Sequence, residues 1–166
     1  MLNTENVKRI LVEKRQGFDL EAKALKKDLV ESLHINTIED IRVLNRYDIE
    51  GISDEAYENA AESIFSEPNL DVVYHEEISN LDKKNKRVFA IEYLPGQYDQ
   101  RGDWAAQCIQ IVNNGVRPTI NTARVYILSG NITDDQFDRI KRYCINPVDS
   151  REASLNNTSL GLMMAI

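Results

Sequence analysis

The densest run of polar and reactive side chains is the stretch 94–103, which reads LPGQYDQRGD. Pro95-Gly96 predicts a tight turn, and Asp99 or Asp103 can cap the helix that follows it. The planar guanidinium group of Arg101 can hold a carboxylate or a pair of carbonyl oxygens. Two interpretations are open for this stretch: a capped helix with a local Arg–Asp pair, or a surface that binds a partner.

Other candidate catalytic groups lack the neighbours that catalysis needs. Cys108 and Cys144 are predicted on apolar helix faces, where a free cysteine usually behaves as a small hydrophobic side chain. His75 precedes two glutamates, but no second histidine follows at the spacing of a zinc motif, so a surface loop is expected. The sequence also lacks a glycine-rich phosphate loop and a nucleophile elbow. We therefore predict no catalytic residue and no metal site.

Composition excludes several classes of protein. The chain has 166 residues, 42% hydrophobic and 28% charged, which suits one domain or two small halves that share a core. The formal net charge of −7 disfavours broad binding to nucleic acid or to anionic membranes, because both require a positive field. No apolar run is long enough to span a bilayer, and the first ten residues lack the apolar stretch of a secretory signal. We expect a cytoplasmic protein.

The first half of the sequence predicts strands and helices in alternation. Residues 38–49 alternate between apolar and polar side chains, which is typical of a strand with one buried face. Residues 76–87 are polar and are expected to form a solvated loop. The other expected elements are strands at residues 9–13 and 70–74 and helices that begin at Asp19 and Ser53.

The same order recurs in the second half. Residues 88–93 and 120–128 predict strands, and Gly115 is suited to end the helix between them. Thr133 and Gln136 have the spacing of a capping box. The residues expected to face the core are Ala105, Cys108, Ile109 and Val112 on the first helix and Phe137, Ile140 and Cys144 on the second.

Turn and stop signals are offset by a constant distance between the two halves. Gly17 matches Gly96 and Pro68 matches Pro147, each 79 positions apart. We infer an internal duplication with halves at about 7–75 and 87–149, within one domain that covers residues 1–153. The expected fold class is α+β, with two pseudo-symmetric β-α-β-α halves and largely antiparallel sheets covered by helices. Each half is expected to bury the apolar sheet face of the other about a pseudo-two-fold axis.

Residues 154–166 match no part of the repeat. They are expected to form the start of an interdomain linker or a frayed tail, and the apolar ending LGLMMAI favours the linker.

Two blocks of sequence resemble a known family. EYLPGQYDQR at 92–101, followed by AAQC at 105–108, is similar to the N-terminal region of phosphoribosylformylglycinamidine synthase. NPVDSREA at 146–153 resembles a second block of that family, and the segments 12–15 and 64–67 are also similar. The resemblance extends from about residue 8 to 154. It departs from the family at Gly102 and Trp104, where the family usually has small residues such as Ala and Ser.

The resemblance implies a role in de novo purine biosynthesis. The family is a ligase that uses ATP, with Mg²⁺, and glutamine to convert formylglycinamide ribonucleotide to formylglycinamidine ribonucleotide. Its synthetase and glutaminase domains follow this region, which resembles a fused pair of the family's small subunit. No catalytic residue of the family maps onto this chain, so no cofactor is expected within it. The implied function is a non-catalytic scaffold that positions the two domains for ammonia transfer.

On this interpretation two segments are the expected contacts with the synthetase and glutaminase domains. They comprise Pro95, Gly96, Gln97, Tyr98, Asp99, Gln100 and Arg101, together with Asn146, Pro147, Asp149, Ser150 and Arg151. A fused pair already satisfies the surface between its halves, so we expect a monomer, without nucleic-acid or membrane partners. The alternative function is a free-standing ligand-sensing module of paired β-α-β type, which requires a ligand groove between its halves. An independent enzyme, with Cys108 as its nucleophile, is a third possibility.

Overall fold

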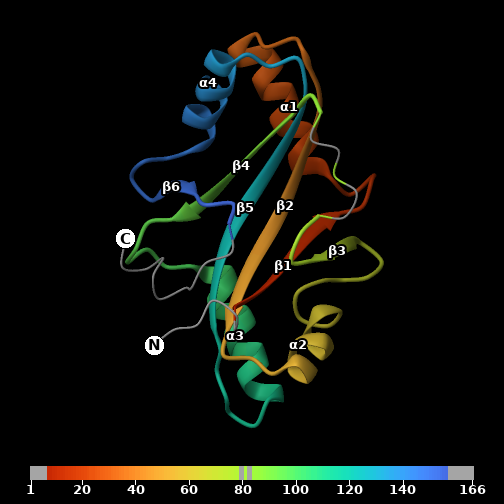
Figure 1. The fold of residues 1–166 in the computed structure, drawn as a ribbon, viewed down its shortest axis with the longest axis vertical. Coiled ribbons are helices and arrows are strands. Elements are labelled where there is room, and N and C mark those ends of the chain that lie inside the picture. Colours follow the sequence, from red (N-terminus) through yellow and green to blue (C-terminus); the bar gives the residue numbers. More distant parts are fainter. Residues whose placement is uncertain (1–6, 79–80, 82–83, 157–166) are drawn as a thin grey trace.

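Helices and strands follow one another in two similar series. The computed structural model describes residues 7–78, 81 and 84–156 (Figure 1). The first series is β1 (Val7–Lys14), α1 (Leu20–Leu33), β2 (Ile38–Glu50), α2 (Asp54–Ala61) and β3 (Asp71–His75). The second series is β4 (Lys86–Tyr93), α3 (Gln100–Val112), β5 (Thr119–Gly130), α4 (Asp134–Cys144) and β6 (Ser150–Ala153). The α+β class and the repeated order of elements are confirmed.

One antiparallel sheet contains all six strands, in the order β3-β1-β2-β5-β4-β6. This order is symmetrical about the boundary between β2 and β5. Asn45 of β2 pairs with Arg124 of β5, and these residues are also 79 positions apart, so the pseudo-two-fold axis passes between them. The expectation that the halves cover each other's sheet faces is wrong. They join edge to edge, because pairing β2 with β5 satisfies the backbone groups that each half would otherwise leave unpaired at its edge.

All four helices cover the same face of the sheet, in two pairs at opposite ends (Figure 1). One core cluster joins α2 and α3 to the strands, with Tyr57 and Ile109 among its buried residues. The other joins α1 and α4, with Leu29 and Ile140 at its centre. Each pair contains one helix from each half, so neither half can complete a core alone. In the described part of the chain, no helix has the length and apolar character needed to cross a membrane.

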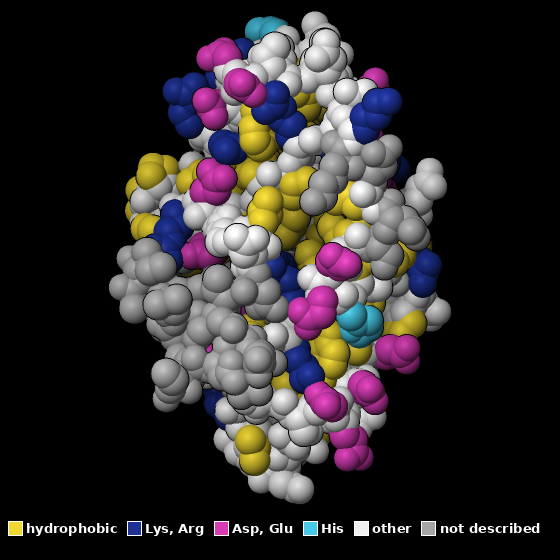
Figure 2. All heavy atoms as spheres, viewed as in Figure 1, with side chains coloured by type: hydrophobic (Ala, Val, Ile, Leu, Met, Phe, Trp, Pro, Cys, Tyr) yellow, Lys and Arg dark blue, Asp and Glu magenta, His cyan; other side chains and the backbone are white. Residues whose placement is uncertain are grey.

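The opposite face of the sheet is also buried. Its apolar cluster includes Leu11, Leu44 and Ile127. Arg46 and Asp48 lie there as well, at 2% and 1% exposure, so the polar side of the alternating pattern in β2 does not face solvent as expected. On the face that Figure 2 displays, acidic and basic side chains are intermixed around a central region of hydrophobic side chains.

A buried ion cluster connects β1, β2 and the residues after β6. The guanidinium of Arg9 donates to both carboxylate oxygens of Asp48, at 2.7 and 3.0 Å. Arg9 also donates to the carbonyl of Leu155, at 2.7 Å, and Arg46 donates to the carbonyl of Ser154, at 2.8 Å. Arg9 donates to the carbonyl of Asn156 as well, at 3.2 Å, so residues 154 to 156 are held against the sheet and are not frayed. The rest of the expected linker, residues 157–166, lies outside the described residues.

The local predictions hold at most helix ends. The Ser53 hydroxyl accepts from the N–H of Ala56, and Thr133 and Gln136 form the expected capping box. Asp19 precedes α1 as predicted, but its carboxylate accepts from the N–H of Gly17 instead of from the helix.

Three details of the second half differ from the sequence-based expectation. β4 begins at Lys86, inside the predicted loop, and β6 was not predicted because its four residues show no apolar alternation. The buried face of α3 consists of Gly102, Ala105, Ala106 and Ile109, whereas Val112 is 72% exposed. The small residues determine which face of α3 is buried, because they let the helix approach the sheet closely. A Cβ atom on Gly102 would lie 2.7 Å from the carbonyl oxygen of Ile120.

Candidate binding groove at the pseudo-two-fold axis

Asp99 fixes the start of α3 against β5. Its carboxylate accepts hydrogen bonds from the backbone N–H groups of Gly102 and Thr122, at 2.9 and 2.7 Å, and from the Thr122 hydroxyl, at 2.8 Å. The pairing of β4 with β5 ends at Glu92 and Ala123, so Asp99 takes the place of a strand partner at Thr122. The predicted cap is confirmed, and it also anchors the preceding turn to the sheet.

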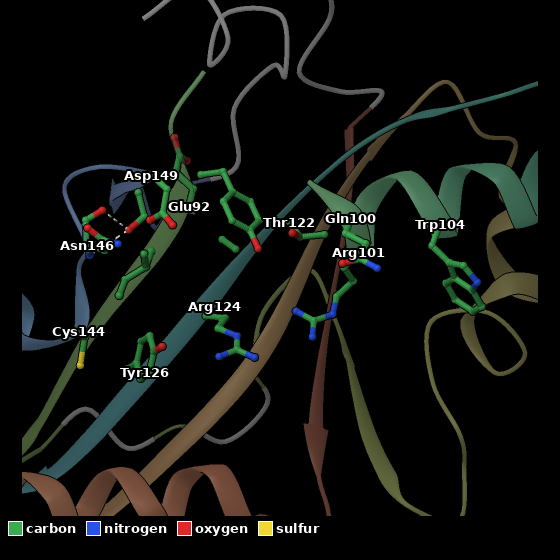
Figure 3. Close-up of a pocket in the computed structure, with 14 residues that line it drawn as sticks. Glu92, Gln100, Arg101, Trp104, Thr122, Arg124, Tyr126, Cys144, Asn146 and Asp149 are labelled. Atoms are coloured by element: carbon green, nitrogen blue, oxygen red, sulfur yellow. Dashed lines mark hydrogen bonds between the residues drawn. The ribbon is translucent and has the colours of Figure 1, made fainter. Parts of the chain in front are cut away.

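A groove crosses the helix-covered face of the sheet between the two helix pairs (Figure 3). Its two lobes have volumes of about 740 and 380 Å³, and Arg101 and Arg124 line both. The larger lobe brings together residues from both predicted contact segments, namely Gln100, Arg101, Asn146, Asp149 and Ser150.

The two lobes occupy equivalent places in the two halves. Val12 and Tyr47 line the smaller lobe, and the residues 79 positions later, Ile91 and Tyr126, line the larger lobe. At the same offset, Phe65 of the smaller lobe corresponds to Cys144 of the larger. This exchange of a phenyl ring for a thiol leaves space unfilled in the larger lobe.

A second exchange replaces an ion pair with two neutral side chains. Lys14 and Asp71 form an ion pair across the smaller lobe, at 2.9 Å. Tyr93 and Ser150 line the larger lobe at the equivalent positions. The larger lobe therefore lacks the phenyl ring and the ion pair of its counterpart, and it has nearly twice the volume.

Two polar contacts link the halves at the axis. Arg101, the second residue of α3, donates from Nη1 to Oδ1 of Asn45 in β2, at 3.0 Å. Glu21, the second residue of α1, forms an ion pair with Arg124 of β5. Each contact joins a helix of one half to the axial strand of the other. The local Arg–Asp pair considered for Arg101 does not form among the described residues, because Arg101 reaches across the axis.

The two predicted contact segments lie side by side. The N–H of Leu94 donates to the carbonyl of Asp149, at 2.9 Å, and Arg151 donates to Glu92, at 2.8 Å. The remaining predicted residues divide between a small neighbouring cavity of about 80 Å³ and the exposed rim. Pro95, Gly96, Gln97, Asp99 and Arg151 line that cavity, whereas Tyr98 and Pro147 are exposed.

Asn45, Thr122 and Arg124 are groove residues that the sequence analysis did not single out. Asn45 and Arg124 are 79 positions apart, which is the offset that aligns the halves, so the sequence could have indicated that these two residues are equivalent. Trp104, one of the two positions at which the chain departs from the resembled family, is 54% exposed and lines the larger lobe.

The remaining candidate chemical groups have structural partners. The Tyr57 hydroxyl lies 2.7 Å from Nδ1 of His75, and burial raises the pKa of Tyr57 to about 12. The described residues contain no group of three or more His, Cys, Asp or Glu side chains that could hold a metal ion. The larger lobe of the groove is suited to binding a ligand, through Arg101 and through the aromatic side chains of Trp104 and Tyr126.

Burial raises the pKa of the Cys144 thiol to about 11. At pH 8 about one thiol in a thousand is then ionised, so we expect slow modification by Ellman's reagent in a Cys108→Ser variant, which keeps Cys144 as its one cysteine. The rate should be on the order of a hundredfold below that of an exposed cysteine, and should rise about tenfold per pH unit up to pH 10. A rate that levels off near pH 9 would contradict the buried environment of Cys144.

Comparison with known proteins adds no assignment: no family model matches this chain, and no curated protein matches it.

Proposed function

We propose that this chain is the N-terminal scaffold domain of a phosphoribosylformylglycinamidine synthase. One observation carries the proposal: the two blocks that resemble the family come together in space. The first block, residues 92–101, and the second, residues 146–153, meet where β4 pairs with β6, with Glu92 opposite Arg151 and Tyr93 opposite Ser150. A surface built from both blocks is what a contact with neighbouring domains requires.

The symmetry of the sheet also supports the proposal. The resemblance is to a fused pair of small subunits, which implies two related halves in one chain. The strand order β3-β1-β2-β5-β4-β6 relates β1 to β4, β2 to β5 and β3 to β6 about the axis. Because each core cluster uses helices from both halves, the pair forms one unit and not two tethered modules.

In this proposal the chain positions the neighbouring domains and catalyses no step of the reaction itself. The synthetase and glutaminase domains supply the ATP, Mg²⁺ and glutamine sites of this purine-biosynthetic ligase. Asp99 and the Arg151–Glu92 pair hold the two contact segments rigidly against the sheet. Rigidity matters because ammonia must pass from one domain to the other before it escapes, and a misplacement of about 1 Å can cost about a hundredfold in rate.

Val148 offers a direct test in the full-length enzyme. It lies between the two halves of the second contact segment and is 79% exposed, so a polar substitution there should not disturb folding. We expect Val148→Asp to lower glutamine-dependent turnover about tenfold and to leave ammonia-dependent turnover nearly unchanged, because a buried carboxylate would disrupt the domain contact. Both turnovers are measured by amidine formation at saturating ATP.

Val116→Asp is the matched control, since Val116 is 54% exposed and follows α3, outside both contact segments. It should leave both turnovers unchanged. Equal losses of glutamine- and ammonia-dependent turnover in Val148→Asp would count against a coupling role.

A second candidate function is a free-standing ligand-sensing module of paired β-α-β type. The larger lobe of the groove favours it, because such a module needs a ligand site between its halves. A purine nucleotide that raises the unfolding temperature of the isolated chain by several degrees would favour the sensor, and no shift would favour the scaffold.

A further inference from the structure

The two lobes of the groove differ in volume and in the side chain at the second position of the helix beside each lobe. The smaller lobe has Glu21 at the second position of α1, whereas the larger lobe has Arg101 at the second position of α3. The smaller lobe is also filled by Phe65 and by the Lys14–Asp71 pair. The smaller lobe therefore has a carboxylate at the helix position where the larger lobe has a guanidinium group, and it has about half the volume.

Arg101 is the groove cation whose charge is left unmatched. Its hydrogen-bond partner Asn45 is neutral and accepts from Nη1, which leaves the Nε and Nη2 edge of the guanidinium group for another acceptor. Arg124 is paired with Glu21, and Arg151 with Glu92. Within residues 7–78, 81 and 84–156, no carboxylate forms an ion pair with Arg101. An arginine edge of this kind matches the two oxygens of a carboxylate.

Apolar and aromatic side chains form the walls beside Arg101. Trp104 follows Arg101 by three positions on α3, so both side chains lie on the same side of the helix. Figure 3 shows Arg101 and Trp104 extending from one end of α3 and Tyr126 on the facing strand. Ile91 completes the apolar floor. A ligand here would have a flat apolar body as well as an anionic group.

The charges in the lobe favour a monoanion. Of the two cations that line it, Arg124 is paired with Glu21, so one cation, Arg101, is left for an anionic ligand. A single carboxylate opposite Arg101 adds one pairing, whereas the second charge of a phosphate ester would meet no further cation among the lining residues.

We propose that the larger lobe is a binding site for a small monocarboxylate with an apolar body, held by Arg101. The lobe shares Arg101 and four other lining residues with the two predicted contact segments, but binding of the ligand does not depend on the scaffold function. Phe65 and the carboxylate of Glu21 make the smaller lobe a poorer site for such a ligand, so we expect one molecule to bind per chain.

Trp104 is the single tryptophan of the chain, so its fluorescence reports on this lobe. The probes are phenylacetate and its neutral isostere phenylacetamide, titrated into the 166-residue chain. We expect a saturable change with phenylacetate, with a Kd on the order of 1 mM, and binding at least tenfold weaker with phenylacetamide. Equal affinity for the two probes, or no saturable change with phenylacetate, would overturn the proposal.

Two pairs of variants locate the site. Cys144→Phe introduces the ring that fills the smaller lobe and should abolish binding, whereas Cys144→Ser should retain it. Arg101→Gln should weaken binding at least tenfold, and Arg101→Lys should weaken it less. Urea unfolding midpoints within error of the parent show that each variant is folded. Undiminished binding in folded Cys144→Phe would place the ligand elsewhere and refute the assignment, and the Val148→Asp test of the scaffold function would be unaffected.

Discussion

Replacing Asp48 with asparagine is expected to lower the free energy of unfolding by about 3–5 kcal/mol. Asp48 forms ion pairs with both Arg9 and Arg46, and all three side chains are at most 5% exposed. Burial lowers the pKa of Arg46, and the charge of Asp48 opposes that shift. Without the carboxylate, two guanidinium groups stay buried and uncompensated. Urea unfolding followed by circular dichroism at pH 7 measures the loss.

Glu152→Gln is the control for this prediction. Glu152 pairs with Lys141 at 3.4 Å, but its side chain is 50% exposed, so water replaces the lost interaction. The urea midpoint of this variant should change little. Similar small changes in both variants would show that water reaches the Asp48 cluster, contrary to the packing described for this face of the sheet.

Gly130→Ala is expected to cost at least about 3 kcal/mol of unfolding free energy. Gly130 ends β5 with a φ of 125°, a backbone conformation that alanine rarely adopts. A Cβ atom there would lie 2.2 Å from the carbonyl oxygen of Thr37 and 3.0 Å from the backbone nitrogen of Glu39. Both neighbours are backbone atoms beside the first β2–β5 pair, so they cannot move without opening the junction of the halves.

Gly17→Ala separates the cost of backbone strain from the cost of the steric clash. Gly17 also has a positive φ, of 95°, but a Cβ atom would meet nothing within 4 Å. Its cost should be the backbone strain alone, about 1–2 kcal/mol in the same urea experiment. Equal losses in the two variants would mean that the junction at Gly130 relaxes freely and that the steric argument fails.

Local signals in the sequence predicted much of the fold. Ser53 and Thr133 cap helices in the structure because a side-chain oxygen in that position satisfies an N–H group that the first turn leaves free. The repeated order of turns and stops predicted two related halves. These features depend on residues within a few positions of one another, and for that reason they can be inferred from one chain.

The long-range features could not be inferred in the same way. Arg46 and Asp48 appear on the polar side of an alternating strand, and only the packing of Arg9 and of residues 154–155 shows that this side is buried. Val112 fits the apolar face of α3 by spacing, but the small residues Gly102 and Ala106 decide which face approaches the sheet. β6 forms because β4 presents a free edge to it, not because its own sequence favours a strand.

The candidate site was predicted in part. The stretch 94–103 was identified from its polar residues, and Arg101 does line the groove. Its partner Asn45 lies 56 positions away and meets it only because β2 and β5 pair at the axis. The larger of the two lobes has Cys144 where the smaller has Phe65, and this exchange is recognised only when the two lobes are compared in space.

Complementation of an enzyme that lacks this domain tests the scaffold proposal most directly. The synthetase and glutaminase domains, expressed without residues 1–153, are assayed for glutamine-dependent amidine formation with and without the separate 166-residue chain. We expect that the chain alone consumes neither ATP nor glutamine, and that it restores glutamine-dependent turnover in a saturable manner. Hydrolysis of ATP or glutamine by the chain alone, or full glutamine-dependent turnover in its absence, would contradict the account.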